Sequence, residues 1–174
     1  MSDNVLNLFV YKVDRNKITE TEFKQILEVE RSEGLEDAYS EEVMREILIN
    51  DPKDDNFVCS HNGKIVGYIS YNPNSKRREG STYIISLVLI PEYRRQGIAQ
   101  ELIYSASKYY LEKGEPKIMS LQVDKDNYPA INLYKKVGFE IVEPICELDE
   151  DDDQYIMAAE VTKIINTLEV SFKR

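Results

Sequence analysis

The segment that most constrains the fold is residues 81–99, which read STYIISLVLIPEYRRQGIA. The apolar run 83–90 predicts a buried strand, and Pro91 ends it. A basic turn at 94–96 follows, and the small residues in 97–99 open a predicted helix. A helix N-terminus has unpaired backbone N–H groups, and small residues let an anion approach them closely. The segment therefore predicts a strand, a phosphate-binding loop and a helix, in that order.

A second segment lies downstream at 127–139, where Asn127 is followed by Pro129-Ala130, Leu133-Tyr134 and Gly138-Phe139. Arg94-x-x-Gly97-x-Ala99 after a strand is similar to the (Arg/Gln)-x-x-Gly-x-(Gly/Ala) motif of the GCN5-related N-acetyltransferase (GNAT) family. The downstream segment resembles the family pattern Asn-x-x-Ala-x-x-Leu-Tyr-x-x-x-Gly-Phe. The two segments in this order and context are a much more specific signal than either alone.

The resemblance implies an α/β (α+β) fold: a single domain, residues 1–174, with a mixed, splayed central sheet flanked by helices. It implies acetyl-CoA as the acyl donor and an amine as the acceptor. Backbone N–H groups of Gln96 to Ala99 are the expected pyrophosphate cradle, and a backbone N–H near Val88 to Ile90 is the expected oxyanion donor. The residues expected to contact the cofactor are Leu89, Ile90, Arg94, Arg95, Gln96, Gly97, Ile98, Ala99, Asn127 and Tyr134.

Tyr134 is the expected catalytic residue. It occupies the position of the family tyrosine near the CoA sulfur, and a phenol with a pKa of about 10 can protonate a leaving thiolate. The competing interpretation is packing against a neighbouring strand. Asn127 has a similar second interpretation as a plain helix N-cap, and both of its roles can hold together.

No general base is assigned from the sequence. Many family members carry a glutamate on the central strand, whereas this strand has no carboxylate between Tyr83 and Val88. Glu79 precedes the strand and His61 has a suitable intrinsic pKa, but a solvated loop and a hairpin turn are the simpler interpretations. Glu33, Glu36 and Asp37 lie in a loop that borders the acceptor site in this family, and they are candidates for orienting an ammonium. Proton loss through a chain of water molecules is a further alternative.

Local patterns predict the other elements. Thr19 and Glu22 form a capping box with Ile18 and Phe23 as a staple, and Ser40 caps a second helix. That second helix is expected to bury Val43, Met44, Ile47 and Leu48. Asn62-Gly63 predicts a hairpin turn. Further strands are expected at 5–13, 57–61, 64–71, 117–123, 139–143 and 154–160, and further helices at 97–113, 128–137 and, as a short tail, 161–174.

Composition excludes several function classes. The net charge of −10 disfavours nucleic acid as a partner, and no apolar run is long enough for a membrane span. His61 is the only histidine, and two cysteines, Cys59 and Cys146, do not form a zinc pattern, so we expect no metal. The thiols and the absence of a secretory leader pattern fit a cytoplasmic protein, either a monomer or a homodimer. Lys76, Arg77 and Arg78 are either solvated or in contact with a nucleotide phosphate.

The acidic residues are localised. Residues 19–50 carry ten acids and three bases, and residues 143–153 carry seven acids and no base. In the GNAT family both stretches border the acceptor, so a cationic acceptor such as a polyamine, a lysine or a peptide N-terminus is expected. Solubility is the alternative explanation of the acidic faces. The predicted function is acetyl transfer to a primary amine by direct attack in a ternary complex. A non-catalytic acyl-CoA-binding module is the alternative.

Overall fold

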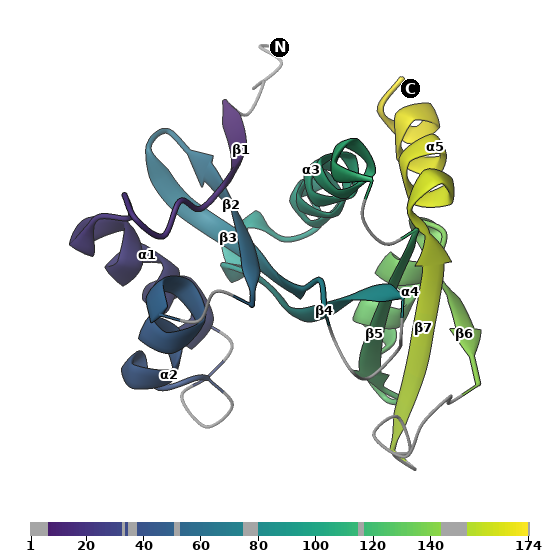
Figure 1. Cartoon of the computed structure of the whole chain (residues 1–174), viewed down its shortest axis with the longest axis horizontal. Coiled ribbons are helices and arrows are strands. Elements are labelled where there is room, and N and C mark those ends of the chain that lie inside the picture. Colours follow the sequence, from purple (N-terminus) through teal and green to yellow (C-terminus); the bar gives the residue numbers. More distant parts are fainter. Residues whose placement is uncertain are drawn as a thin grey trace. The chain divides into compact units, whose positions relative to one another are not determined.

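The computed structural model describes residues 7–32, 34, 38–50, 53–74, 80–114, 117–143 and 153–173. Seven strands are hydrogen-bonded in the order β1-β2-β3-β4-β5-β7-β6, and helices flank this mixed sheet (Figure 1). Contacts divide the chain into two compact units. The first comprises residues up to Ser70 together with Ser86–Leu102, and the second comprises Tyr71–Ile85 and Ile103–Arg174.

The first unit packs two helices against a meander of strands. It contains β1 (Leu8–Lys12), α1 (Glu20–Arg31), α2 (Glu41–Arg45) with a wider π-helical turn at Glu46–Asn50, β2 (Asp55–His61), most of β3 (Lys64–Asn72) and the end of β4 (Ser81–Leu89). β1 lies antiparallel beside β2, with Leu8 opposite His61 and Lys12 opposite Phe57. The buried core of this unit combines Phe23, Ile26 and Leu27 from α1 with Met44 and Leu48 from the second helical segment.

The predicted helix starts are confirmed in this unit. The Thr19 hydroxyl accepts the Glu22 N–H at 3.2 Å, and the Glu22 carboxylate accepts the Thr19 N–H at 2.9 Å, which completes the capping box. Ser40 caps α2 by accepting the Val43 N–H. The predicted burial of Val43 is wrong, because 41% of it is exposed. Met44 is fully buried, as predicted.

The predicted hairpin turn is also confirmed. Both Asn62 and Gly63 have positive φ, as the Asn-Gly pair predicts.

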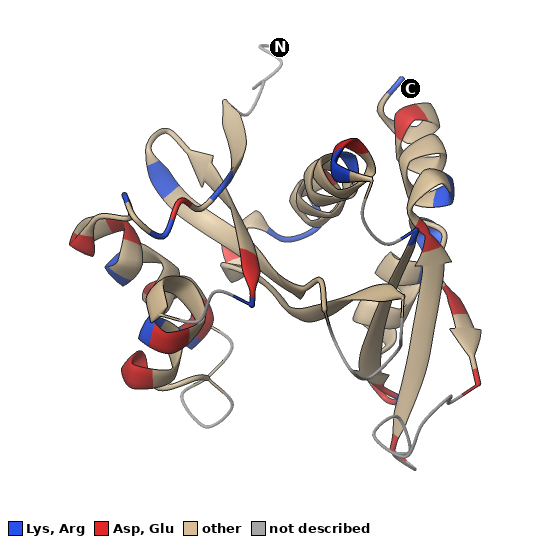
Figure 2. Ribbon diagram, viewed as in Figure 1, with Lys and Arg blue, Asp and Glu red and all other residues tan. Residues whose placement is uncertain are grey.

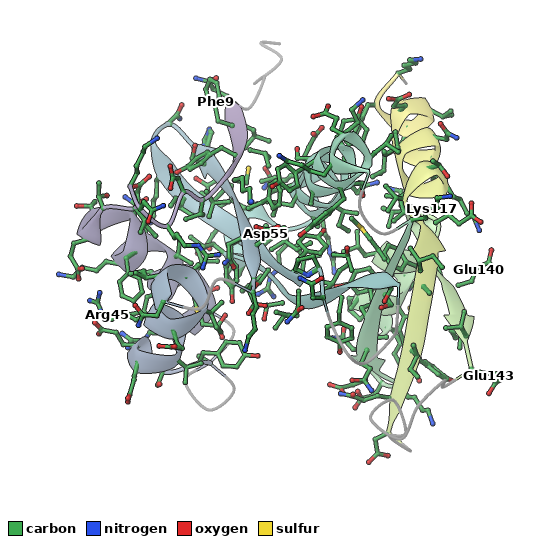
Figure 3. The ribbon with its side chains drawn as sticks, in the orientation of Figure 1. Phe9, Arg45, Asp55, Lys117, Glu140 and Glu143 are labelled. Carbon is green, nitrogen blue, oxygen red and sulfur yellow. The ribbon has the colours of Figure 1, made fainter. Side chains whose placement is uncertain are left out.

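Acidic and basic residues both occur along α1 and α2 (Figure 2), and Arg45 of α2 binds one glutamate from each helix. Arg45 donates to Glu20 at 2.8 Å and to Glu41 at 2.9 Å, and its guanidinium lies 4.1 Å from the centre of the Phe23 ring (Figure 3). The Arg45 hydrogen bonds lower the pKa of the Glu20 carboxyl. The negative charge of these helices is therefore partly used to hold them together.

The second unit is built around one parallel and two antiparallel pairs of strands. It contains the start of β4, most of α3 (Ile98–Lys113), β5 (Ile118–Asp124), α4 (Tyr128–Lys136), β6 (Glu140–Val142), β7 (Gln154–Glu160) and α5 (Val161–Phe172). β4 pairs in parallel with β5 over its first three residues only, from Ser81 opposite Ile118 to Tyr83 opposite Ser120. Such a short pairing is expected for two strands that then splay apart. β7 pairs with β5 over seven residues and with β6 over three.

Each edge strand of the sheet carries a large exposed apolar side chain. Phe9 on β1 is 62% exposed and projects away from its strand, and Ile141 on β6 is 44% exposed (Figure 3). Glu140 on β6 pairs with Lys163 of α5, which places charge beside this edge. The predicted tail helix is confirmed as α5, whose buried stripe is Val161, Ile164, Ile165 and Leu168. No helix in the described part of the chain is long and apolar enough to cross a membrane.

Candidate active site

The loop between β4 and α3 presents a row of unpaired backbone donors. Pro91–Tyr93 form a single 3-10 turn after β4, and α3 begins at Ile98. Arg95 has φ of 60° and Gly97 has φ of 84°, so the chain takes two left-handed steps within three residues. Among the described residues, no acceptor contacts the backbone N–H groups of Gln96 to Ala99. Successive N–H groups in such a turn, at the start of a helix, form a concave anion-binding site.

Side chains hold this loop to the strand before it. Arg94 Nε donates to the Leu89 carbonyl at 3.2 Å, and Gln96 Nε2 donates to the Glu92 carbonyl at 2.7 Å. A Cβ on Gly97 would have only Gln100 Oε1 nearby, at 3.9 Å, so the backbone is open at this point. The Arg95 guanidinium is exposed, and within the described residues it makes no hydrogen bond or ion pair. The loop thus combines a backbone held by side-chain hydrogen bonds with an exposed positive charge.

The end of β4 narrows the choice of oxyanion donor. The Ile90 N–H donates to the Val66 carbonyl of β3 at 3.0 Å, so it is not available to a developing oxyanion. The expected donor, a backbone N–H near Val88 to Ile90, is then better assigned to a residue other than Ile90, and this assignment stays a prediction. Successive N–H groups along a strand point to opposite edges, so the Leu89 N–H points to the other edge of β4. Gly67 on β3 packs tightly here, because a Cβ on it would lie 2.1 Å from Leu89 Cδ2.

Asn127 and Tyr134 belong to the second unit, on α4. Asn127 Oδ1 accepts the Ala130 N–H at 3.2 Å, which confirms the N-cap interpretation and leaves the amide nitrogen to other contacts. Gly138 follows the helix with φ of 106°, and the Phe139 N–H returns to the Tyr134 carbonyl at 2.9 Å. The Asn-to-Phe pattern therefore specifies a complete short helix with both of its ends.

Tyr134 lies in a group of aromatic and phenolic side chains. It is 8% exposed, and its ring meets Phe139 edge-on at 5.5 Å between centroids. Burial raises the pKa of Tyr134, and the nearby Tyr83 raises it further. Burial also raises the pKa of Tyr71, with Tyr134 as the next contributor. A phenol with a raised pKa stays protonated at neutral pH, as a proton donor must.

Sequence reasoning missed Tyr83 and Gln122. Tyr83 on β4 donates from its hydroxyl to Gln122 Oε1 on β5 at 3.1 Å, and both side chains are half-buried. The parallel pairing of their strands runs from Ser81–Ile118 to Tyr83–Ser120, so this hydrogen bond lies at the end of the pairing. The only sequence signal was two polar groups at interior positions of predicted strands, and such a signal is too general to identify a site. The structure adds them to the surroundings of Tyr134.

The structure does not favour His61 as the general base. His61 Nδ1 contacts the Tyr93 hydroxyl at 3.0 Å, and its Nε2 faces the Asn62 amide nitrogen at 3.2 Å, so both ring nitrogens are engaged. Burial raises the pKa of Cys59 to about 11, and the neighbouring Glu101 adds to the shift, so this cysteine stays a thiol. Other residues singled out in the sequence lie outside the described residues: Glu33, Glu36, Asp37, Lys76, Arg77, Arg78, Glu79, Cys146 and the acidic run 144–152.

Comparison with known proteins identifies the class. A model of the acetyltransferase (GNAT) family matches residues 21–139, and the chain belongs to this family. The N-alpha-acetyltransferase of Sulfurisphaera tokodaii is 34% identical over 114 residues, which cover 59% of this chain and 67% of that protein. The N-alpha-acetyltransferase MAK3 of Arabidopsis thaliana is 37% identical over 83 residues, 48% of this chain and 43% of that protein. The protein is thus an N-acetyltransferase.

Solved structures support the same fold. The PaiA N-acetyltransferase of Thermoplasma acidophilum, solved with coenzyme A, superposes with a TM-score of 0.64 at 20% identity. The match covers 89% of this chain and 99% of that one. The predicted mixed, splayed sheet flanked by helices is therefore confirmed.

Proposed function

We propose that the protein transfers an acetyl group from acetyl-CoA to the α-amino group of a peptide or protein. The observation that carries the proposal is the row of backbone N–H groups from Gln96 to Ala99, for which no described residue provides an acceptor, next to the exposed Arg95. This row suits the pyrophosphate of a CoA thioester. An α-amino acceptor is favoured by two relatives that this chain matches in part, both of which are named N-alpha-acetyltransferases.

The proposed reaction is direct attack in a ternary complex. The amine nitrogen forms a bond to the thioester carbonyl carbon, and the carbonyl oxygen becomes an oxyanion near the Leu89 N–H. The C–S bond then breaks, and Tyr134, the acid that the family pattern assigns, gives its phenolic proton to the CoA thiolate. The new amide nitrogen loses its extra proton to solvent, and solvent returns a proton to the Tyr134 oxygen. Arg94 fixes the Leu89 carbonyl at 3.2 Å, so the peptide unit that follows Leu89 is held while charge develops nearby.

A polyamine is the second candidate acceptor, because α1 and α2 carry most of their charge as carboxylates. The structure weakens that argument, because several of these carboxylates already bind groups within the protein. Glu20 and Glu41 bind Arg45, and Glu22 is used in the capping box. Glu28 and Glu42 remain exposed on these helices. An ammonium is therefore attracted, but by fewer carboxylates than the sequence suggests.

A thiol-release assay with acetyl-CoA tests the proposal. The acceptors are a panel of short peptides with free N-termini, the same peptides with blocked N-termini, and spermidine. We expect turnover on free N-termini and none on blocked ones. Turnover on spermidine alone would replace the peptide acceptor by a polyamine. Tight acetyl-CoA binding without turnover on any amine would favour the acyl-CoA-binding module instead.

A further inference from the structure

A buried carboxylate on α1 has no role in the reaction described so far. Glu30 is 5% exposed. Its Oε1 accepts the Tyr39 backbone N–H at 2.8 Å, and its Oε2 accepts the Tyr68 hydroxyl in a short hydrogen bond. A carboxylate is strongly disfavoured in an apolar interior unless its oxygens are satisfied. Here both oxygens are satisfied, and one of them is connected to another proton-carrying group.

The connection continues from Tyr68 to the central strand. Tyr68 on β3 is 1% exposed, and its hydroxyl also hydrogen-bonds to the Ser86 hydroxyl on β4. Burial raises the pKa of Tyr68, and Glu30 raises it further, whereas the Ser86 hydrogen bond acts in the opposite direction. Because Tyr68 donates to Glu30, it accepts from Ser86. The hydrogen bonds thus point along one line, from Ser86 through Tyr68 to Glu30.

Only one end of this line is accessible. Ser86 is half-buried, whereas Tyr68 and Glu30 are sealed. Side chains two residues apart on a strand share a face, so Ser86 lies on the same face of β4 as Val88 and Ile90. Val88 and Ile90 both pack against the core formed by α1 and the second helical segment. The Ser86 hydroxyl is therefore the entry to a path that ends inside that core.

We propose that Glu30 is the proton acceptor for the attacking amine and that Tyr68 and Ser86 relay the proton to it. The inference rests on the proposed acetyl transfer. The acceptor ammonium gives one proton to the Ser86 oxygen as the Ser86 proton moves to the Tyr68 oxygen and the Tyr68 proton moves to Glu30 Oε2. The amine becomes neutral, Glu30 becomes a carboxylic acid, and both hydroxyls are regenerated. Reversal of the same path returns the proton to solvent after acetyl transfer.

This relay compensates for the lack of a carboxylate on the central strand. β4 reads Ser81 to Leu89 with no acidic residue, and Ser86 is a polar side chain on the strand face that also carries Val88, which packs against the α1 core. A hydroxyl alone is a weak base, but one that can pass its proton to a carboxylate is not limited by its own pKa. The titratable groups recorded around Tyr68 are Glu30 from α1 and Tyr39 from the segment before α2.

The test measures kcat across pH with a free-N-terminus peptide for the wild type and two variants, Glu30→Gln and Ser86→Ala. Glutamine keeps an acceptor for the Tyr39 N–H and a partner for Tyr68, but it takes up no proton. Glu112→Gln is the matched control, because Glu112 is also a helical glutamate, is exposed on α3 and has no part in the proposed site. Thermal unfolding and acetyl-CoA affinity are measured for every variant, and both are expected to stay near the wild-type values.

We expect Glu30→Gln and Ser86→Ala to lower kcat about 100-fold near pH 6.5, where an α-amino group with a pKa of about 8 is mostly an ammonium. The deficit should shrink to within about threefold near pH 9.5, where solvent already supplies the neutral amine. The control should follow the wild type throughout. An equal deficit at every pH, or no deficit at all, would overturn the relay. A wild type that acetylates no probe amine refutes the transferase itself, so the two failures are distinguishable.

Discussion

Gly67 on β3 is predicted to be intolerant of even one added carbon, because of Leu89 on β4. A Cβ at Gly67 would lie 2.1 Å from Leu89 Cδ2 and 3.1 Å from the Val88 carbonyl oxygen. Carbon atoms pack at about 3.5–4.0 Å, so the Leu89 methyl must move by roughly 1.5 Å. Overpacking of this kind costs about 1–3 kcal/mol, and we expect Gly67→Ala to lower the free energy of unfolding by that amount.

The reasoning makes a stronger prediction for the double variant. Leu89→Ala alone should cost about 2–3 kcal/mol, since Leu89 is largely buried. In that background the 2.1 Å clash with the Leu89 methyl is gone, and only the 3.1 Å approach to the Val88 carbonyl oxygen remains. Alanine in a strand is favoured over glycine by about 0.5–1 kcal/mol, which offsets this remaining contact. Gly67→Ala should then be close to neutral, so the two substitutions should be non-additive by about 1–3 kcal/mol.

Urea unfolding of the wild type, both single variants and the double variant, followed by circular dichroism, measures this coupling. The four values close a cycle in which only the direct contact between the two side chains survives subtraction. Additive changes would show that Gly67 is needed for a reason other than its approach to Leu89. The reasoning about close packing at the end of β4 would then be refuted.

Three further predictions concern the loop, a helix start and the proposed acid. Gly97→Ala and Gly114→Ala both force alanine into a left-handed conformation, and each should cost about 1 kcal/mol of stability. Only Gly97→Ala should also weaken acetyl-CoA binding, by about tenfold as measured by calorimetry. The hydrogen bond from the Thr19 N–H lowers the pKa of Glu22, so the Glu22 carboxylate stabilises the fold above its unfolded pKa of about 4.3. Glu22→Gln should lower the free energy of unfolding in urea by roughly 1 kcal/mol at neutral pH, and this difference should fade as the pH drops below about 4.3. An equal difference at pH 2 would contradict the capping argument. Tyr134→Phe should lower kcat about 100-fold with little change in acetyl-CoA affinity, and an unchanged kcat would return Tyr134 to a packing role.

The elements that sequence predicted well are those that local residues define. The Thr19–Glu22 capping box, the Asn62-Gly63 turn and the Gly138 helix end each involve residues close together in the chain, and each is confirmed. The order of strands and helices follows from such signals together with apolar periodicity. Burial of Val43 was mispredicted because a single turn of helix contains too few residues to fix which face points inward.

The missed features are contacts between residues far apart in the chain. Tyr68 and Glu30 are separated by 38 positions, and Tyr83 and Gln122 by 39. The hydrogen bond from Ile90 to Val66 likewise joins two strands, and it removed a donor that the family motif had suggested. No local pattern marks such pairs, because each depends on strand register and helix placement. They are nevertheless the contacts on which the proposed relay and the choice of oxyanion donor rest.

The path of the chain through its two units limits how the protein can be cut. The chain passes from one unit to the other after Ser70, Ile85 and Leu102, so β4 and α3 each contribute to both. A fragment that ends at Leu102 would hold the whole first unit, but it would also carry the start of β4 without the β5 residues that pair with it. Neither half is therefore expected to be an autonomous folding module. Split versions of this enzyme should regain structure only when both fragments are supplied together, by complementation.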